Sequence, residues 1–318
     1  MDEPTVGSDY EVPFSARSGG ARKIQPRFGH FLGASYVDEQ SEPSQLIFRW
    51  VGRLFFGIAL IVFGGQEFVY SGQVGDLGLL GGWMPADTVL AWVAGTLLIV
   101  AGVAVLTGIY TREIAVPMGV VFAAAAVLRF TPAIPEMWKN WGDRGVPAEL
   151  FASGAGMWML AAMVRGGWPS DRTARRLAGV GLAVFGVAHL VFGSIHLQVG
   201  PTIASLIPAW LPERLFLAYA TGVALVAAGL VFLAGRWVRP GVMRATGLLL
   251  GLMYFSWVVI VHAPRIAHAL HNGDEWNSGY VCLMMAGIAF LAGTGRPGGS
   301  ASRRSAALSA DVLLAVGE

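Results

Sequence analysis

Four ionisable side chains interrupt apolar stretches of the sequence, and they are the residues best suited to chemistry. Glu67 lies in FGGQEFVY, Arg129 in AVLRFTP, His189 in FGVAHLVF and His262 in VIVHAPR. Inside a bilayer such a group costs about 2.5–3.5 kcal/mol on insertion scales, which makes it a functional candidate. A neutral imidazole donates to a carbonyl and exchanges protons at about pH 6.5. We therefore take all four as candidate catalytic residues, with His189 and His262 as ligands of a quinone head group.

The same residues also fit other roles. Glu67 and Arg129 have opposite charge at similar predicted depth, so an ion pair between them would simply hold two helices together. His189 and His262 fit neutral histidines bonded to neighbouring helices. Because they lie on separate helices at similar depth, they also fit bis-histidine haem ligation, but two histidines alone are a weak haem signal. A proton relay toward the outside remains open as well.

A histidine-rich loop, RIAHALHNGDEW, offers a surface zinc site. Its four potential ligands are His268, His271, Asp274 and Glu275. This loose spacing is common by chance, so no metal site is predicted here. The chain also has no GxGxxG within a βαβ setting and no Walker A sequence, so no nucleotide or flavin site is expected.

The composition shows what must position these groups. Of 318 residues, 55% are hydrophobic and 13% are charged, whereas a soluble domain carries about 25% charged residues. A net charge of +2 gives no basic surface for nucleic acid. The single cysteine, Cys282, excludes an internal disulfide or a CxxC pair. These values predict an all-α, polytopic membrane protein in contact with the lipid bilayer.

Eight apolar runs are long enough, with tilt, to cross a hydrocarbon core of about 30 Å. They are residues 54–70, 88–110, 114–130, 148–164, 177–192, 215–233, 247–261 and 279–294. The segments outside them, 1–45 and 296–318, are polar tails without a cleavable signal peptide. Of the 22 lysines and arginines, 17 fall in the segments that share a side with both termini. The positive-inside rule therefore predicts cytoplasmic termini in the cytoplasmic (inner) membrane.

The chain repeats itself. Residues 85–112 align without gaps on residues 212–239, with ten identities in 28 positions. Each repeat holds four spans, an even number, so both halves should have the same orientation, related by an axis along the membrane normal. We predict two parallel four-helix modules, 46–166 and 167–295. Aligning Phe63 with Phe185 then places Glu67 on His189, so that the modules differ in chemistry.

These features resemble the DoxX family of four-helix membrane proteins. The likeness rests on an arginine-led first helix, a loop closing on proline (IPAWLP), and a second helix with the pattern TGV…AAGL…R. Some DoxX-like proteins belong to thiosulfate:quinone oxidoreductases and others to membrane redox assemblies. The resemblance implies a component of a quinone-linked redox system acting with other membrane or exported subunits. The near absence of cysteine argues against a thiol mechanism.

Two other functions fit the sequence. One is a non-enzymatic subunit of a larger membrane complex, in which the polar groups only join helices. The other is a carrier of a small solute or lipid between the two modules. Parallel halves allow rocking, but no pair of broken helices occurs at matching positions. Whether the chain is an enzyme stays open.

Overall fold

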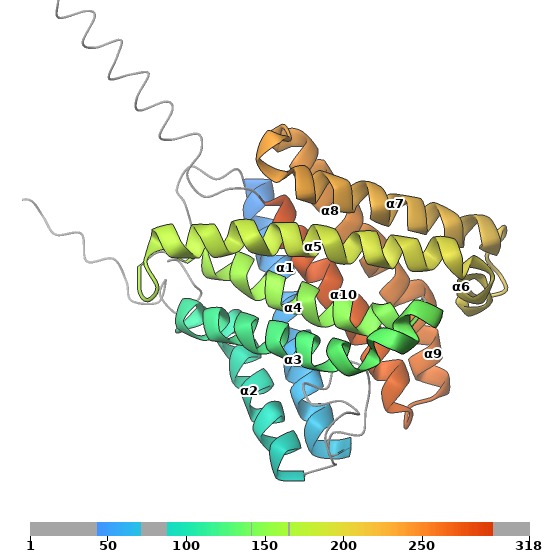
Figure 1. Ribbon diagram of the computed structural model, residues 1–318, viewed down its shortest axis with the longest axis horizontal. Helices are drawn as coiled ribbons and strands as arrows, with labels where there is room; N and C mark the ends of the chain where they lie inside the picture. The colour runs from blue at the N-terminus through green and yellow to red at the C-terminus, as the bar shows by residue number, and fades with distance from the viewer. Residues whose placement is uncertain (1–42, 71–87, 141, 165, 295–318) are drawn as a thin grey trace, which may run out of the picture.

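All secondary structure in the described part of the chain is helical. The computed structural model describes residues 43–70, 88–140, 142–164 and 166–294. The predicted polar tails therefore lie almost wholly outside the described residues. The α-helices and short helical turns, labelled in part in Figure 1, are α1 Pro43–Tyr70, α2 Thr88–Thr107, α3 Thr111–Lys139, η3 Gly142–Arg144, α4 Gly145–Ala161, α5 Asp171–Gln198, α6 Gly200–Leu206, α7 Arg214–Ala234, η4 Gly235–Trp237, α8 Pro240–Trp257, η5 Val258–His262, α9 Ala263–His268 and α10 Gly273–Gly293.

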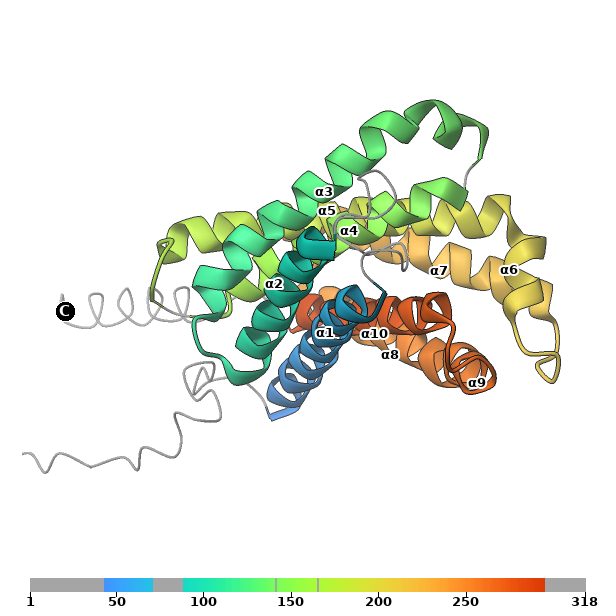
Figure 2. The same cartoon turned by 90° about the horizontal axis from the view of Figure 1, so that it is seen from below.

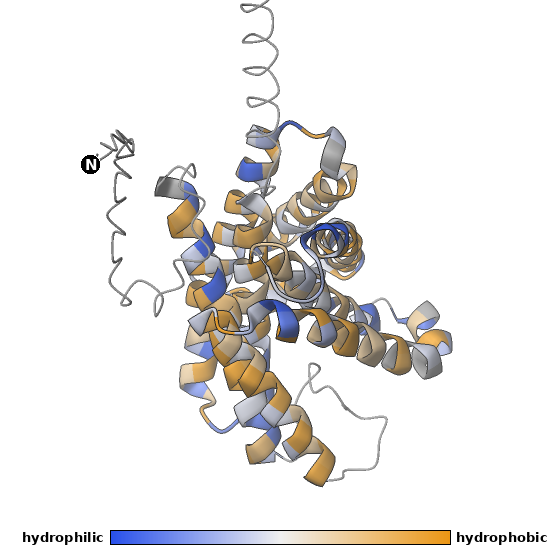
Figure 3. Cartoon of the chain, turned by 90° about the vertical axis from the view of Figure 1, so that its left-hand side faces the viewer, coloured by the Kyte–Doolittle hydropathy of each residue, from blue (hydrophilic) through white to orange (hydrophobic). Residues whose placement is uncertain are grey.

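Seven of these helical segments are long and apolar enough to cross a membrane. They are Gln45–Tyr70, Thr88–Thr107, Thr111–Leu128, Asp171–Gln198, Arg214–Ala234, Pro240–His268 and Gly273–Gly293. Large apolar side chains on their outer faces are exposed, among them Val89, Leu230 and Leu249. Figure 3 shows hydrophobic residues along the bodies of most helices. Such a surface is stable in lipid rather than in water, so this is an integral membrane protein.

The remaining predicted span, residues 148–164, forms the core helix α4. With 17 residues α4 is the shortest of the eight main helices, and nearly every side chain from Pro147 to Ala161 is buried. Each of the eight apolar runs thus forms a helix. Seven are confirmed as long enough to span, and the eighth lies in the middle of the protein.

Two buried arginines close the ends of neighbouring helices. Arg53 of α1 donates from Nε and Nη2 to the carbonyl of Val105 at 3.0 and 2.8 Å, where α2 ends. Arg112 of α3 donates to the carbonyls of Ala161, the last residue of α4, and of Val164, and it pairs with Asp171 at 2.5 Å. The last carbonyls of a helix have no partner within it, so these guanidinium groups satisfy otherwise buried acceptors.

Glycine pairs bring α1 against α2 and α5 against α7. A Cβ added at Gly102 would lie 2.7 Å from the Gly57 carbonyl oxygen, and one at Gly95 would lie 2.6 Å from that of Gly64. The α5–α7 pair repeats this arrangement. A Cβ at Gly229 would lie 2.7 Å from the Gly186 oxygen, and Gly222 faces Gly193 in the same way. The absence of side chains at these positions lets two helix backbones touch, as is usual in membranes.

These contacts fix which residues of α1 and α5 correspond, and they show that the alignment of Phe63 with Phe185 is wrong. The Gly57–Gly102 contact matches Gly186–Gly229, so FGIALIVFG (56–64) lies on FGVAHLVFG (185–193), with six identities in nine positions. The error is seven residues, or two helical turns, because Phe-Gly occurs twice in each helix at that spacing. Glu67 therefore corresponds to His196, and Leu60 corresponds to His189.

The last two helices of each half also correspond. Gly119 of α3 faces Trp158 of α4, while Gly251 of α8 faces Phe290 of α10. The difference in residue number between Gly119 and Gly251, and between Trp158 and Phe290, equals the difference between Pro132 and Pro264. The two halves therefore share one scheme of helix contacts.

Central contacts between the halves are reciprocal. Helix α4 packs on α5, α10 packs on α1, and α4 meets α10 at the centre (Figures 1 and 2). A Cβ at Gly181 would lie 2.7 Å from the Ala155 oxygen, and one at Gly52 would lie 2.8 Å from the Gly287 oxygen. These are equivalent positions in the two halves. The core helices α4 and α10 thus join the halves by contacts of the same kind.

Candidate ligand-binding cavity

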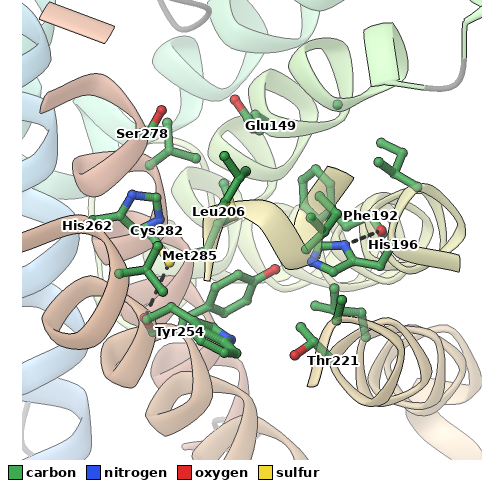
Figure 4. A pocket seen from close by; sticks show the side chains of 18 of the residues that line it. Glu149, Phe192, His196, Leu206, Thr221, Tyr254, His262, Ser278, Cys282 and Met285 are labelled. Atoms are coloured by element: carbon green, nitrogen blue, oxygen red, sulfur yellow. Dashed lines mark hydrogen bonds between the residues drawn. The ribbon is translucent and has the colours of Figure 1, made fainter. Parts of the chain in front are cut away.

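A cavity of about 370 Å³ lies where the second half of the chain meets α4. It is lined by residues of α5, α6, α7, α8, η5, α9 and α10, and by Gly142, Gly145 and Glu149 of the first half. Its walls are mainly apolar, with Phe192, Leu206, Leu225 and Met285 among the lining residues. Figure 4 shows His262 on one side of this space, His196 on the other and the Tyr254 ring between them. The polar groups come from different helices and share one cavity, which is typical of a small-molecule site.

Two buried polar atoms beside this cavity have no hydrogen-bond partner. They are the indole Nε1 of Trp257 and Nδ1 of His262. A buried donor or acceptor without a partner costs about 1–3 kcal/mol. Native proteins therefore rarely leave one, and two in the same wall need an explanation. Both atoms belong to side chains that line the cavity.

His262 owes its position to a local change of helix type. Residues Val258–His262 form a π-helical turn between α8 and α9. The turn carries an extra residue and so changes the direction of side chains beyond it. The ring packs near Gly279 of α10, whose added Cβ would lie 3.4 Å from His262 Cβ. His262 is one of the residues that line the cavity, and its role as a site residue stays a prediction.

His189 lies behind the cavity wall and is completely buried. Its ring is surrounded by Phe185, Phe192 and Phe232, with centroid distances of 4.2, 5.6 and 6.0 Å. Its Nδ1 lies 2.7 Å from the Phe185 carbonyl oxygen, and its Nε2 lies 3.1 Å from the Tyr254 hydroxyl. Both nitrogens are engaged, so this histidine reaches the cavity through Tyr254 and is not arranged as a haem ligand.

His196 takes the place in the cavity that His189 was expected to have. Its Nδ1 lies 2.9 Å from the Phe192 carbonyl oxygen, and its ring lines the cavity from α5. It lies seven residues after His189, on the same face of one continuous helix. The glycine and prolines that follow it do not end the helix before residue 198.

The first half places Glu67 in a buried position. Glu67 is 4% exposed, and its Cβ would lie 3.1 Å from a Cβ added at Gly95 of α2. Arg129 belongs to α3, but its side chain lies outside the described residues. The proposed Glu67–Arg129 ion pair stays a prediction.

The loop considered for zinc is organised by an ion pair instead. Arg265 donates from Nε and Nη2 to the two carboxylate oxygens of Glu275, both at 2.8 Å. His268 and His271 are exposed. Within the described ranges, no group of three or more histidine, cysteine, aspartate or glutamate side chains is arranged to hold a metal.

Tyr254, Trp257 and Glu149 were missed by sequence reasoning. Tyr254 and Trp257 lie in the apolar run 247–261. An aromatic residue in such a run is normally interpreted as part of the hydrophobic core. Glu149 begins the apolar run 148–164 and lines the cavity from α4. An acid at that point was a usable signal, because its run was predicted to lie in the membrane. Cys282 also lines the cavity, and its thiol donates to the Tyr254 carbonyl at 3.3 Å.

A larger cavity of about 640 Å³ lies between α3, α4 and α5. Among the described residues that line it, Arg144 alone is polar, and its Nε donates to the Met137 carbonyl at 2.9 Å. These described residues do not form the converging set of polar groups that distinguishes a specific site.

No family model matches the chain, and neither the curated proteins nor the solved structures gave a significant match.

Proposed function

We propose that this integral membrane protein binds a quinone-type ring in the cavity of its second half, as a component of a membrane redox system. Trp257 Nε1 and His262 Nδ1 carry this proposal: both atoms are unpartnered, and both belong to side chains that line one mainly apolar cavity. A quinone ring is flat and apolar with oxygen atoms at opposite ends, so it needs an apolar slot with polar groups on two sides. The volume of about 370 Å³ falls among small-molecule sites, which span about 300–1,000 Å³.

The lining residues fit such a ring. Trp257 would donate to an oxygen atom of the ring, and the ring would lie between His262 and His196, which are on opposite sides of the cavity (Figure 4). Phe192 and Met285 offer aromatic and polarizable surface for the ring faces. A bound quinone would supply reversible two-electron chemistry, with the electron donor on another subunit.

The architecture that we propose is two parallel four-helix modules, 46–166 and 167–295, with both termini in the cytoplasm. Equivalent glycine contacts at Gly57–Gly102 and Gly186–Gly229 support the repeat. The excess of arginine on one side supports the orientation. Together with the resemblance to DoxX proteins, this favours a membrane subunit that works with redox partners.

Binding of decylbenzoquinone to the full-length protein in lipid nanodiscs tests this function. Replacing Trp257 by phenylalanine removes one hydrogen-bond donor and should weaken binding about tenfold, since one hydrogen bond is worth about 1 kcal/mol and more when its partner is left buried. His262→Ala should weaken it further by opening the cavity wall. His268→Ala, at an exposed histidine outside the cavity, is the matched control.

Saturable binding that depends on Trp257 and His262 but not on His268 supports the proposal. Absence of binding, together with no quinone in organic extracts of the purified protein, would favour a structural subunit of a larger complex. Equal binding by all variants would place the ligand elsewhere.

A further inference from the structure

The hydrogen-bond chain behind the cavity has a fixed direction. The Phe185 carbonyl oxygen only accepts, so Nδ1 of His189 carries the hydrogen that joins them at 2.7 Å. In a neutral imidazole the other nitrogen is then an acceptor. The Tyr254 hydroxyl, 3.1 Å away, must therefore donate to His189 Nε2. Its hydrogen points away from the cavity, and its oxygen lone pairs remain for a ligand.

His189 is held in this neutral form by its surroundings. The ring has no solvent exposure and lies among three phenylalanine rings. An imidazolium there would be a buried charge without an acidic partner, which is far more costly than a neutral ring with both nitrogens bonded. The two hydrogen bonds satisfy the neutral ring completely.

The same argument applies to His196. Its Nδ1 donates to the Phe192 carbonyl at 2.9 Å, so Nε2 of the neutral ring is an acceptor. Both the Tyr254 oxygen and His196 Nε2 belong to side chains that line the cavity. The wall between α5 and α8 thus offers two acceptors, whereas Trp257 offers a donor.

We propose that the cavity selects the reduced, hydroxyl-bearing form of its ring ligand, a hydroquinone, over the oxidised quinone. This inference rests on the proposed function. A hydroquinone hydroxyl donates one hydrogen bond and also accepts one, so it matches the tyrosine or histidine acceptor and the Trp257 donor. A quinone carbonyl only accepts, and against Tyr254 and His196 it would set lone pairs against lone pairs.

Binding of three probes to the full-length protein in nanodiscs under argon tests the selection. The probes are decylhydroquinone, decylbenzoquinone and the dimethyl ether of decylhydroquinone. The hydroquinone should bind about tenfold more tightly than either of the others, because each of the others leaves an acceptor unmatched. The ether keeps the oxygen atoms and the ring but cannot donate.

Two substitutions should each reduce this preference, one by weakening hydroquinone binding and the other by strengthening quinone binding. Tyr254→Phe removes one acceptor, so hydroquinone affinity should fall about tenfold. Quinone affinity should not fall, because the substitution also removes the oxygen lone pairs that oppose a quinone carbonyl. His189→Leu leaves the Tyr254 hydroxyl without its acceptor and free to donate into the cavity. Quinone affinity should then rise by about three- to tenfold. Leucine stands at the equivalent position, Leu60, in the first half.

Tyr280→Phe is the control, because Tyr280 stacks on Trp276 of the same helix and lies outside the cavity. If His189→Leu does not fold, Tyr254→Phe and the three probes still decide the matter. Equal or tighter binding of the quinone to the native protein would overturn the selection and leave the proposed site intact. Failure of every probe to bind would overturn the proposed function itself.

Discussion

The two halves of the molecule share a scheme of helix contacts but differ in what they enclose. In the second half His189 bonds to Tyr254, and a cavity opens beside them. At the equivalent positions of the first half, Leu60 and Phe122 are buried core residues. The second half carries Trp257 and a π-helical turn at Val258–His262, whereas Ala125 and an unbroken α-helix stand at the matching place in α3.

This difference distinguishes the residues that both halves use to pack their helices from the residues that line the cavity. Glycines at helix contacts and arginines at helix ends appear where two backbones or a helix terminus require them. Most of the polar residues that line the cavity belong to the second half, and Glu149 of α4 comes from the first half. Among the described residues, the second half pairs His189 with Tyr254 beside the cavity, whereas the first half has the apolar residues Leu60 and Phe122 at these two positions.

The largest expected effect concerns the glycine contacts shared by both halves. Gly102→Val and Gly229→Val should each destabilise the protein by about 3 kcal/mol, because the added side chain would lie against a backbone oxygen that cannot move aside. Thermal unfolding in detergent micelles measures the loss. Gly179→Ala is the control, since nothing lies within 4 Å of its added Cβ. Gly179 should tolerate alanine with a gain of up to about 1 kcal/mol.

A loss confined to one half would contradict the shared contact scheme. A loss at Gly179 equal to that at Gly229 would favour the alignment of Phe63 with Phe185, because the same offset places Gly57 on Gly179.

A smaller effect should follow when the polar pair is transferred to the first half. Leu60→His buries an imidazole among apolar groups and should cost about 2 kcal/mol. Adding Phe122→Tyr gives that imidazole its partner and should recover about 1 kcal/mol. The coupling energy from a double-mutant cycle, measured by unfolding, reports whether the two positions face each other as His189 and Tyr254 do. No coupling would mean that the halves do not correspond at these residues.

Sequence reasoning predicted the helices well because an apolar run of about 20 residues has few alternatives to a spanning helix. It failed on the register of α5, since Phe-Gly at 185–186 and at 192–193 are indistinguishable without knowing which glycine meets α7. It predicted that His189 and His262 line one cavity; His262 does, but Tyr254 lies between His189 and the cavity, and residue spacing could not predict this. Side-chain direction depends on helix contacts and on the π-helical turn, and neither follows from residue spacing.

Photolabelling with an azidoquinone, followed by peptide mapping, tests most directly whether the ligand site lies in the second half. We expect label on peptides covering residues 192–207 and 253–265, which line the cavity, and loss of that label in the presence of excess decylhydroquinone. The account would be contradicted if the label appeared on peptides covering residues 54–70 or 111–128 and excess decylhydroquinone removed it equally well.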